Sequence, residues 1–221
     1  TDGEMARLDA LAQEHGIPLI IDNAYGMPFP NIIYSDVTLN WHENIILCFS
    51  LSKIGLPGVR TGIIVAAPEV VKAVSSLNAI VNLSPTRFGA AIAAPLLNDG
   101  RLKQLADQVI QPFYRQQAQT AVSLLKRELG AYPLKIHKPE GAIFLWLWFE
   151  NLPVSSQTLY EMLKAEGTLI IPGEHFFVGI DTQDYPHARE CIRMSIAQDA
   201  ETLEKGIAAI GRVVRGLYDK K

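Results

Sequence analysis

The segment around Lys53 combines side chains that are better suited to chemistry than to packing. An apolar run over residues 45–49 predicts a buried strand, and Ser50, Ser52 and Lys53 follow it directly. A turn rich in glycine and proline then leads to Arg60 and a second apolar run. Hydroxyl groups and a bidentate arginine suit a phosphate group, and a lysine with a lowered pKa is a nucleophile. We therefore expect a phosphate-binding loop with a reactive lysine that adds little to the core.

Two other parts of the chain place polar side chains beside apolar runs. The all-apolar run 17–21 predicts a parallel strand buried on both faces, and it ends at Asp22, with Tyr25 three residues later. Ligand groups of open α/β sheets usually lie where such strands end. Arg193 lies inside the predicted strand 191–196, where an unpaired charge is costly. These residues are candidates for binding charged groups of a ligand.

The motifs Asp-x-x-Tyr, Ser-x-Ser-Lys, Arg-x-Gly and Arg-x-Ser occur in this order. Their residues and order resemble those of the fold-type I aminotransferases (class I/II), which use pyridoxal 5′-phosphate (PLP), and the resemblance spans essentially the whole chain. In that family a lysine holds the cofactor covalently, so the resemblance implies that Lys53 is the catalytic residue. It also implies that the cofactor is bound by Asp22, Tyr25, Ser50, Ser52, Lys53 and Arg60.

The resemblance assigns a separate role to most of these side chains. Asp22 would pair with the pyridine nitrogen of PLP, and Tyr25 would bond the phenolic oxygen of the ring. Ser50 and Arg60 would bind the phosphate, and Arg193 would hold the α-carboxylate of the substrate through a two-pronged contact. Each motif alone also fits a surface loop, a helix cap or an edge-strand ion pair, so their shared order carries the interpretation.

The implied reaction is transamination between an aliphatic amino acid and a 2-oxo acid, and the resemblance is strongest to members that exchange the amino group between valine and pyruvate. Two alternatives stay open. One is a PLP-dependent lyase on the same scaffold. The other is the ligand-sensing, aminotransferase-like domain of a transcription regulator.

Composition excludes several other classes of protein. The chain has 221 residues, 48% of them hydrophobic, which is enough for a sizeable core. Its net charge of −3 and the absence of a strong basic cluster argue against nucleic acid as a main partner. No apolar run is long enough for a membrane span, and the five histidines lack metal-ligand spacing, so we expect neither a membrane partner nor a metal. Cys48 and Cys191 are expected to be buried thiols of a cytoplasmic protein.

The order of predicted elements indicates an α/β fold with two domains. Residues 1–112 resemble part of the PLP-binding large domain, a mostly parallel sheet with helices on both faces. Residues 113–221 would form a smaller C-terminal α+β domain, with the boundary inside a long helix that spans 101–129 and is kinked at Pro112. Phe176, Phe177 and Tyr185 are expected mainly to pack in the core.

The start of the chain suggests that family parts are missing. It begins at Thr1 without an initiator methionine, on a helix predicted over residues 4–15 and capped by Thr1 or Asp2. The resemblance implies that a glycine-rich phosphate loop, an aromatic residue that stacks on the PLP ring, and the first strands precede residue 1. Family members are homodimers with shared sites, so we expect a homodimer when complete and no activity from residues 1–221 alone.

Overall fold

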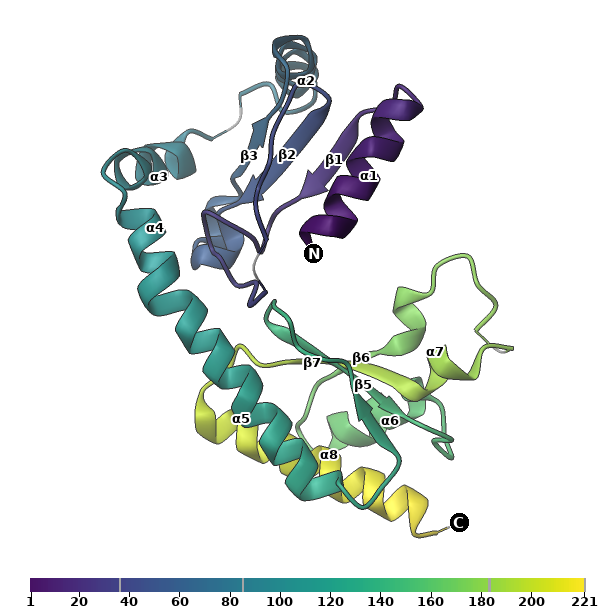
Figure 1. Ribbon diagram of the computed structural model, residues 1–221. Coiled ribbons are helices and arrows are strands. Elements are labelled where there is room, and N and C mark those ends of the chain that lie inside the picture. Colours follow the sequence, from purple (N-terminus) through teal and green to yellow (C-terminus); the bar gives the residue numbers. More distant parts are fainter. Residues whose placement is uncertain (36, 85, 183, 221) are drawn as a thin grey trace. The chain divides into compact units, whose positions relative to one another are not determined.

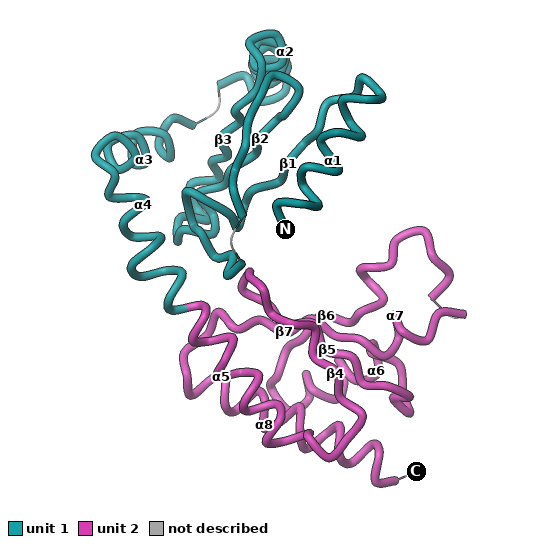
Figure 2. Tube along the Cα trace, in the orientation of Figure 1, with its two compact units in different colours: residues 1–113 teal, residues 114–221 magenta. Residues whose placement is uncertain are grey.

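The computed structural model describes residues 1–35, 37–84, 86–182 and 184–220. These residues form two compact units, 1–113 and 114–221, which Figure 2 colours separately. The boundary falls inside helix α5 (Gln111–Leu129). The assignment of the two units to a PLP-binding domain and a small domain stays a prediction. Within the described ranges, no helix is long and apolar enough to cross a membrane.

The first unit combines a small sheet with four labelled helices (Figure 1). Its helices are α1 (Asp2–Glu14), α2 (Pro68–Val81), α3 (Phe88–Asn98) and α4 (Arg101–Leu105). Its strands are β1 (Leu19–Asp22), β2 (Ile45–Ser50) and β3 (Gly62–Val65). Two short 3₁₀ turns, η1 (Ser52–Ile54) and η2 (Pro57–Val59), connect β2 to β3.

The described sheet of this unit is mixed, with the strand order β1-β2-β3. Strands β1 and β2 are parallel, as expected, whereas β3 returns antiparallel to β2. The link over residues 51–61 contains only the two 3₁₀ turns, and a parallel return requires a longer crossover, usually through a helix. Strand β1 lies at the edge of this sheet, and Ile20 is 65% exposed, so the expectation that both its faces are buried is wrong for the described chain.

The connection between β2 and β3 contributes directly to the core, contrary to the sequence-based expectation. Leu51 is fully buried and Ile54 is 7% exposed. They pack in one cluster with Phe29 and with residues of α3 and α4, among them Leu102. Small and polar residues dominate the loop in sequence, but its few aliphatic side chains all face inward or pack at the edge of this cluster. The loop is therefore fixed by the core beneath it.

Helix α1 is capped by Thr1, one of the two predicted caps, and begins at Asp2, two residues before the predicted start. The Thr1 side chain accepts a hydrogen bond from the Glu4 amide, and the Glu4 carboxylate accepts one from the Thr1 backbone nitrogen, forming a capping box. Ala12 is buried, but Leu8 and Leu11 on the predicted apolar face are each 51% exposed. The described residues therefore cover only part of this face.

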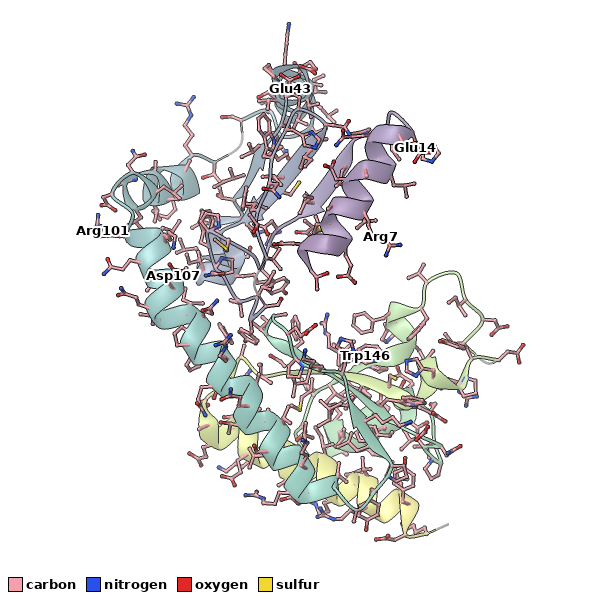
Figure 3. The ribbon with its side chains drawn as sticks, viewed as in Figure 1. Arg7, Glu14, Glu43, Arg101, Asp107 and Trp146 are labelled. Atoms are coloured by element: carbon pink, nitrogen blue, oxygen red, sulfur yellow. The ribbon has the colours of Figure 1, made fainter. Side chains whose placement is uncertain are left out.

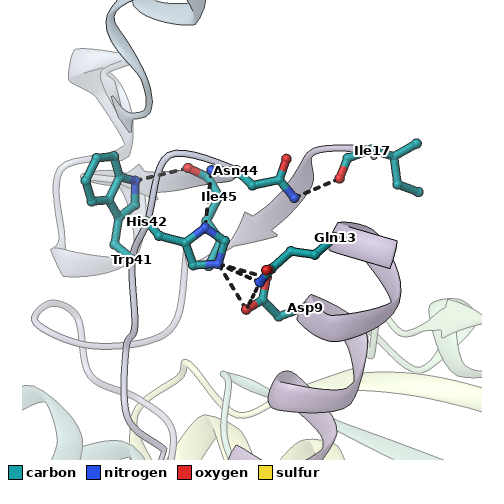
Figure 4. A network of polar contacts seen from close by, with 7 residues as sticks. All are labelled: Asp9, Gln13, Ile17, Trp41, His42, Asn44 and Ile45. Atoms are coloured by element: carbon teal, nitrogen blue, oxygen red, sulfur yellow. Dashed lines mark hydrogen bonds and ion pairs between the residues drawn. The ribbon is translucent and has the colours of Figure 1, made fainter. Parts of the chain in front are cut away.

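A polar network attaches α1 to the segment before β2 (Figure 4). His42 Nε2 lies 2.9 Å from Asp9 Oδ1, and Gln13 Nε2 donates to Asp9 Oδ2 at 3.0 Å. The Asn44 amide donates to His42 Nδ1 at 3.2 Å, so Nδ1 is the acceptor and Nε2 carries the proton toward Asp9. The hydrogen bonds from His42 and Gln13 hold the pKa of Asp9 below its usual value.

The long helix predicted over residues 101–129 is present but not regular. A five-residue π-helical segment, Ala106–Ile110, joins α4 to α5, and the Gln111 amide bonds the Ala106 carbonyl. Pro112 follows directly, and a proline lacks the amide that an α-helix needs at that position. The wider π turn therefore lies just before the proline, as is common where a helix must absorb a missing bond.

The second unit is an antiparallel sheet covered by helices. Its strands are β4 (Leu134–Ile136), β5 (Phe144–Phe149), β6 (Ile171–Pro172) and β7 (Cys191–Ser195), in the order β4-β5-β7-β6. Its helices are α5 (Gln111–Leu129), α6 (Ser156–Ala165), α7 (Pro186–Glu190) and α8 (Ala200–Tyr218), and the 3₁₀ turn η4 (Gly173–Phe176) follows β6. In Figure 1, α5 and α8 run side by side. Arg215 of α8 bonds Glu128 of α5 at 2.9 Å.

Strand β5 separates the core of this unit from a more open face. Leu145, Leu147 and Phe149 are buried, whereas Phe144 and Trp146 alternate with them on the other, half-buried face. Helices α6 and α8 are strongly amphipathic and supply further buried apolar residues of this unit, among them Leu159, Leu163, Leu203 and Ile207. The other face of β5 is thus available to line a site.

We predict that acid loosens α1. The folded-state pKa of Asp9 lies below its unfolded value, so the stabilisation is complete above about pH 4 and is lost as the pH falls through the lowered pKa. Hydrogen exchange should show that protection factors of α1 amides fall in this range in the unmodified protein. In Asp9→Asn protection should already be low near pH 6, with a smaller acid-induced change. Glu14→Gln, which removes a charge from the same helix outside the network, should behave like the unmodified protein. Equal acid sensitivity in Asp9→Asn would contradict the assignment.

Candidate active site

Two strands of the first unit end at the same edge with polar side chains. Asp22 is the last residue of β1 and lies opposite Cys48 of the parallel strand β2. The Asn23 amide continues this ladder with a 2.8 Å bond to the Cys48 carbonyl. Ser50 ends β2 and faces Gly62 at the start of β3. Asp22, Ser50 and the loop that follows Ser50 therefore meet at the carboxyl-terminal ends of the parallel strands β1 and β2. Ligand groups are expected at this end of the sheet.

Lys53 lies in the 3₁₀ turn η1 directly after this edge. Its neighbours Leu51 and Ile54 are in the core, and the amides of Ile54 and Leu56 both donate to the Leu51 carbonyl, at 3.3 and 3.1 Å. Lys53 Nζ lies 5.6 Å from the centroid of the Tyr25 ring. The lysine head group is thus held beside the segment that follows Asp22, so the two separate sequence motifs meet.

The hydroxyl and guanidinium groups of the loop have limited internal contacts. Ser50 Oγ accepts a 3.1 Å bond from the Ser52 amide, which leaves its own proton for another acceptor. Arg60 is exposed and has a left-handed backbone, with φ of 46°. This conformation is uncommon outside glycine, and residues held in it often belong to binding loops. Leu51 anchors the loop because its amide bonds the Thr61 carbonyl at 3.1 Å.

Asp22 is oriented by its own backbone turn. Its Oδ1 atom accepts a 3.1 Å bond from the Ala24 amide. No side-chain cation of the described chain forms an ion pair with this carboxylate. Likewise, neither Lys53 nor Arg60 is paired with a carboxylate in the ranges that the structure describes. One acidic and two basic groups at one edge therefore remain available to a ligand.

This donor set fits PLP on its chemistry. Two hydroxyls and a guanidinium match a phosphate, the carboxylate matches a protonated ring nitrogen, and the lysine amine matches the aldehyde carbon. The residues that would hold the cofactor are the six predicted ones, Asp22, Tyr25, Ser50, Ser52, Lys53 and Arg60. The structure places all of them in the first unit.

Arg193 belongs to the second unit, in the centre of β7. It lies opposite Trp146 of β5 on one side and Ile171 of β6 on the other. Its guanidinium carbon Cζ lies 4.2 Å from the Phe144 ring centroid and 4.9 Å from that of Phe176. Its Nε atom is buried and has no hydrogen-bond partner within the described part of the chain. A carboxylate that bonds Nε–H and a terminal N–H would satisfy this orphaned donor.

The aromatic residues near Arg193 differ from their expected role. Phe176 is 42% exposed and Tyr185 is also exposed, so the expectation that they pack in the core is wrong. They belong to a cluster of rings that includes Trp146, whose ring meets Phe176 edge-on at 5.3 Å (Figure 3 labels Trp146). The contact of Phe144 with Arg193 was not foreseen from the sequence. The alternating pattern of residues 144–148 was the available signal, because it puts Phe144 and Trp146 on one face.

The cysteines give no sign of a second reactive site. Cys191 is buried, as expected, and burial raises the pKa of its thiol to about 12, which keeps it protonated. Cys48 is only half-buried, contrary to expectation. Among the residues that the structure describes, no group of three or more His, Cys, Asp or Glu side chains is arranged to hold a metal ion.

The chain resembles known enzymes along nearly its whole length. The family model described as aminotransferase class I and II matches residues 2–210. The chain is 46% identical to the valine–pyruvate aminotransferase of Escherichia coli over 97% of its own length and 51% of that protein. It therefore spans about half the length of the curated relatives that it matches.

Two solved structures share the fold. A putative amino-acid aminotransferase from Psychrobacter arcticum is 68% identical and superposes with a TM-score of 0.97, over 100% of this chain and 51% of the other. The valine-pyruvate aminotransferase of Salmonella typhimurium is 43% identical, with a TM-score of 0.93 over 100% of this chain and 57% of the other. With the family model matching 2–210, these similarities lead to one conclusion: the chain belongs to the class I and II aminotransferase family, whose members have the fold of type I PLP-dependent transferases.

Proposed function

We propose that the protein is a PLP-dependent aminotransferase that transfers the amino group of valine to pyruvate, giving 2-oxoisovalerate and alanine. The observation that carries the proposal is the position of Lys53. Its buried neighbours fix it beside the carboxyl-terminal ends of β1 and β2, where Asp22 and Ser50 lie. The choice of valine and pyruvate is supported by the 46% identity to the enzyme of Escherichia coli with that printed name.

Each residue of the strand edge has a defined task in this proposal. Lys53 Nζ takes the proton from the substrate Cα as a general base and returns a proton as a general acid. When bound, the cofactor supplies an electron-withdrawing ring that stabilises negative charge at that carbon. The Asp22 carboxylate accepts a hydrogen bond from the protonated ring nitrogen, a charge-assisted bond that contributes about 1.5–3 kcal/mol. Ser50, Ser52 and Arg60 hold the phosphate.

Arg193 has the complementary task of binding the substrate. Its planar fork with two parallel N–H donors matches a carboxylate, and lysine does not offer this geometry. The buried Nε–H, which has no hydrogen-bond partner among the residues that the structure describes, supports this role. Because every α-amino acid carries an α-carboxylate, Arg193 would select for amino acids in general and not for valine.

We further propose that the complete enzyme is a cytoplasmic homodimer that takes part in amino-acid biosynthesis. The family resemblance supports these points, and the negative net charge with two unpaired thiols is compatible with them. Size-exclusion chromatography with light scattering of the full-length protein tests the dimer.

Lys53 should be the residue that retains PLP after chemical reduction. Borohydride treatment of the PLP-loaded, full-length protein should leave the cofactor on the peptide that contains Lys53. Reduction converts the lysine–cofactor linkage into a single C–N bond that resists hydrolysis. Mass spectrometry of the digest locates the label. Lys72 of α2 and Lys103 of α4 are internal controls and should stay unlabelled. Label on either control with an unmodified Lys53 would disprove the assignment.

Small aliphatic amino acids should be preferred over aspartate. In the full-length enzyme, valine and pyruvate should give equal amounts of 2-oxoisovalerate and alanine, with a higher kcat/KM than aspartate and 2-oxoglutarate. Substrates that differ from valine by one methylene should also react, because an apolar pocket separates them by only about 1–3 kcal/mol. Consumption of valine without formation of alanine would indicate a lyase instead. Faster turnover of aspartate than of valine would contradict the proposed substrates.

A further inference from the structure

The guanidinium of Arg193 has no carboxylate partner among the described residues that would hold it in place. The residue lies in a central position of the sheet order β4-β5-β7-β6, and its Nε atom is buried without a hydrogen-bond partner among the described residues. No carboxylate of those residues forms an ion pair with it. A long arginine side chain loses substantial rotamer entropy when it is ordered, so a fixed guanidinium needs other contacts.

Two phenylalanine rings from different elements supply such contacts. Phe144 of β5 lies 4.2 Å from Arg193 Cζ, and Phe176 at the end of η4 lies 4.9 Å from it. Phe144 faces Ser195 across the β5–β7 pair, two residues along from Arg193, so both side chains project from one face of the sheet. Both distances lie within the range in which a ring face attracts a cation.

A third ring supports this arrangement. Trp146 lies opposite Arg193 in the β5–β7 register and meets the Phe176 ring nearly at a right angle, with centroids 5.3 Å apart. Edge-to-face pairs of this kind are favourable. Because Phe176 is 42% exposed, this contact limits the positions that its ring can take beside the guanidinium.

Ring faces hold a guanidinium in a way that suits ligand binding. They attract the cation without accepting hydrogen bonds through lone pairs, so the N–H groups remain available. A carboxylate partner within the protein would instead occupy the same N–H groups that a substrate carboxylate needs. Contacts with aromatic rings can therefore hold the guanidinium in place while its N–H groups stay free to bind a ligand.

We propose that Phe144 and Phe176 are positioning residues that hold the Arg193 guanidinium so that its Nε–H edge receives the substrate carboxylate. The inference rests on the proposed function, because it takes the ligand of Arg193 to be that carboxylate. It adds two residues, neither of which touches the reacting atoms, to the determinants of substrate affinity.

A carboxylate that cannot be transaminated provides the test. The dissociation constant of 3-methylbutanoate is measured by ligand-observed NMR with the PLP-loaded, full-length protein. Phe144→Leu and Phe176→Leu, which keep apolar bulk without a ring face, should each weaken binding by about 3- to 30-fold. Phe144→Tyr keeps the ring face and should bind within about twofold of the unmodified protein.

Two controls separate this effect from general damage. Tyr160→Leu removes a ring that lies 5.5 Å from the Lys164 ammonium on α6, and it should leave binding of 3-methylbutanoate unchanged. Thermal unfolding of every variant checks that the fold is kept. Because Phe176 is partly exposed, its replacement by leucine leaves a smaller cavity than a core substitution does.

A double-mutant cycle decides between positioning and direct contact. Arg193→Lys should weaken binding, and Phe144→Leu or Phe176→Leu should add little in that background because their effect acts through the guanidinium. Full additivity would overturn the proposal, since the rings would then act on the ligand directly. Unchanged binding in both leucine variants, with weakened binding in Arg193→Lys, would overturn it while the proposed function stands. Unchanged binding in Arg193→Lys would refute the proposed role of Arg193 and this inference together.

Discussion

The burial of Leu51 and Ile54 on either side of Lys53 is the constraint on which the candidate site depends. A lysine on a surface loop samples many positions, whereas Lys53 sits on a 3₁₀ turn whose two flanking side chains are packed against α3 and α4. Hydrogen bonds to the Leu51 carbonyl close the turn from inside. Since catalysis can lose about 100-fold when a group moves by about 1 Å, this anchoring would link the packing of the unit to the proposed catalytic role of Lys53.

The cations of the two candidate sites differ from the other charged residues of the chain. Arg127, Lys135 and Arg212 form ion pairs at the surface, which contribute little to stability but satisfy their charges. Lys53 and Arg193 contact aromatic rings, and neither is paired with a carboxylate in the described ranges. An unsatisfied buried N–H is costly, and the proposed substrate carboxylate would satisfy the one that Arg193 has within the described residues. The proposed binding role of Arg193 thus comes with a cost to the stability of the fold, because its buried N–H group is left unpaired without a ligand.

The sequence predicted the local elements of the site better than their packing. Apolar runs that end at Asp22 and Ser50 indicated strand ends, and both residues do end strands. The antiparallel return of β3 and the inward orientation of Leu51 and Ile54 were not foreseen, because they depend on contacts with α3 and α4 far along the chain. The exposure of Phe176 was not predicted either, since composition cannot distinguish a core ring from a partly exposed one.

The most direct test of this account compares cofactor binding in two core variants of the full-length protein. Ile54→Ala and Leu102→Ala both remove buried side chains from the same cluster, and each should cost about 2–5 kcal/mol of stability. The dissociation constant of PLP is measured by equilibrium dialysis at a temperature where both variants are folded. We predict that Ile54→Ala, next to Lys53, weakens PLP binding by about tenfold or more, as expected for a displaced anchor, while Leu102→Ala changes it by less than about twofold. Equal affinities in the two variants would contradict the claim that the core beneath the loop positions Lys53.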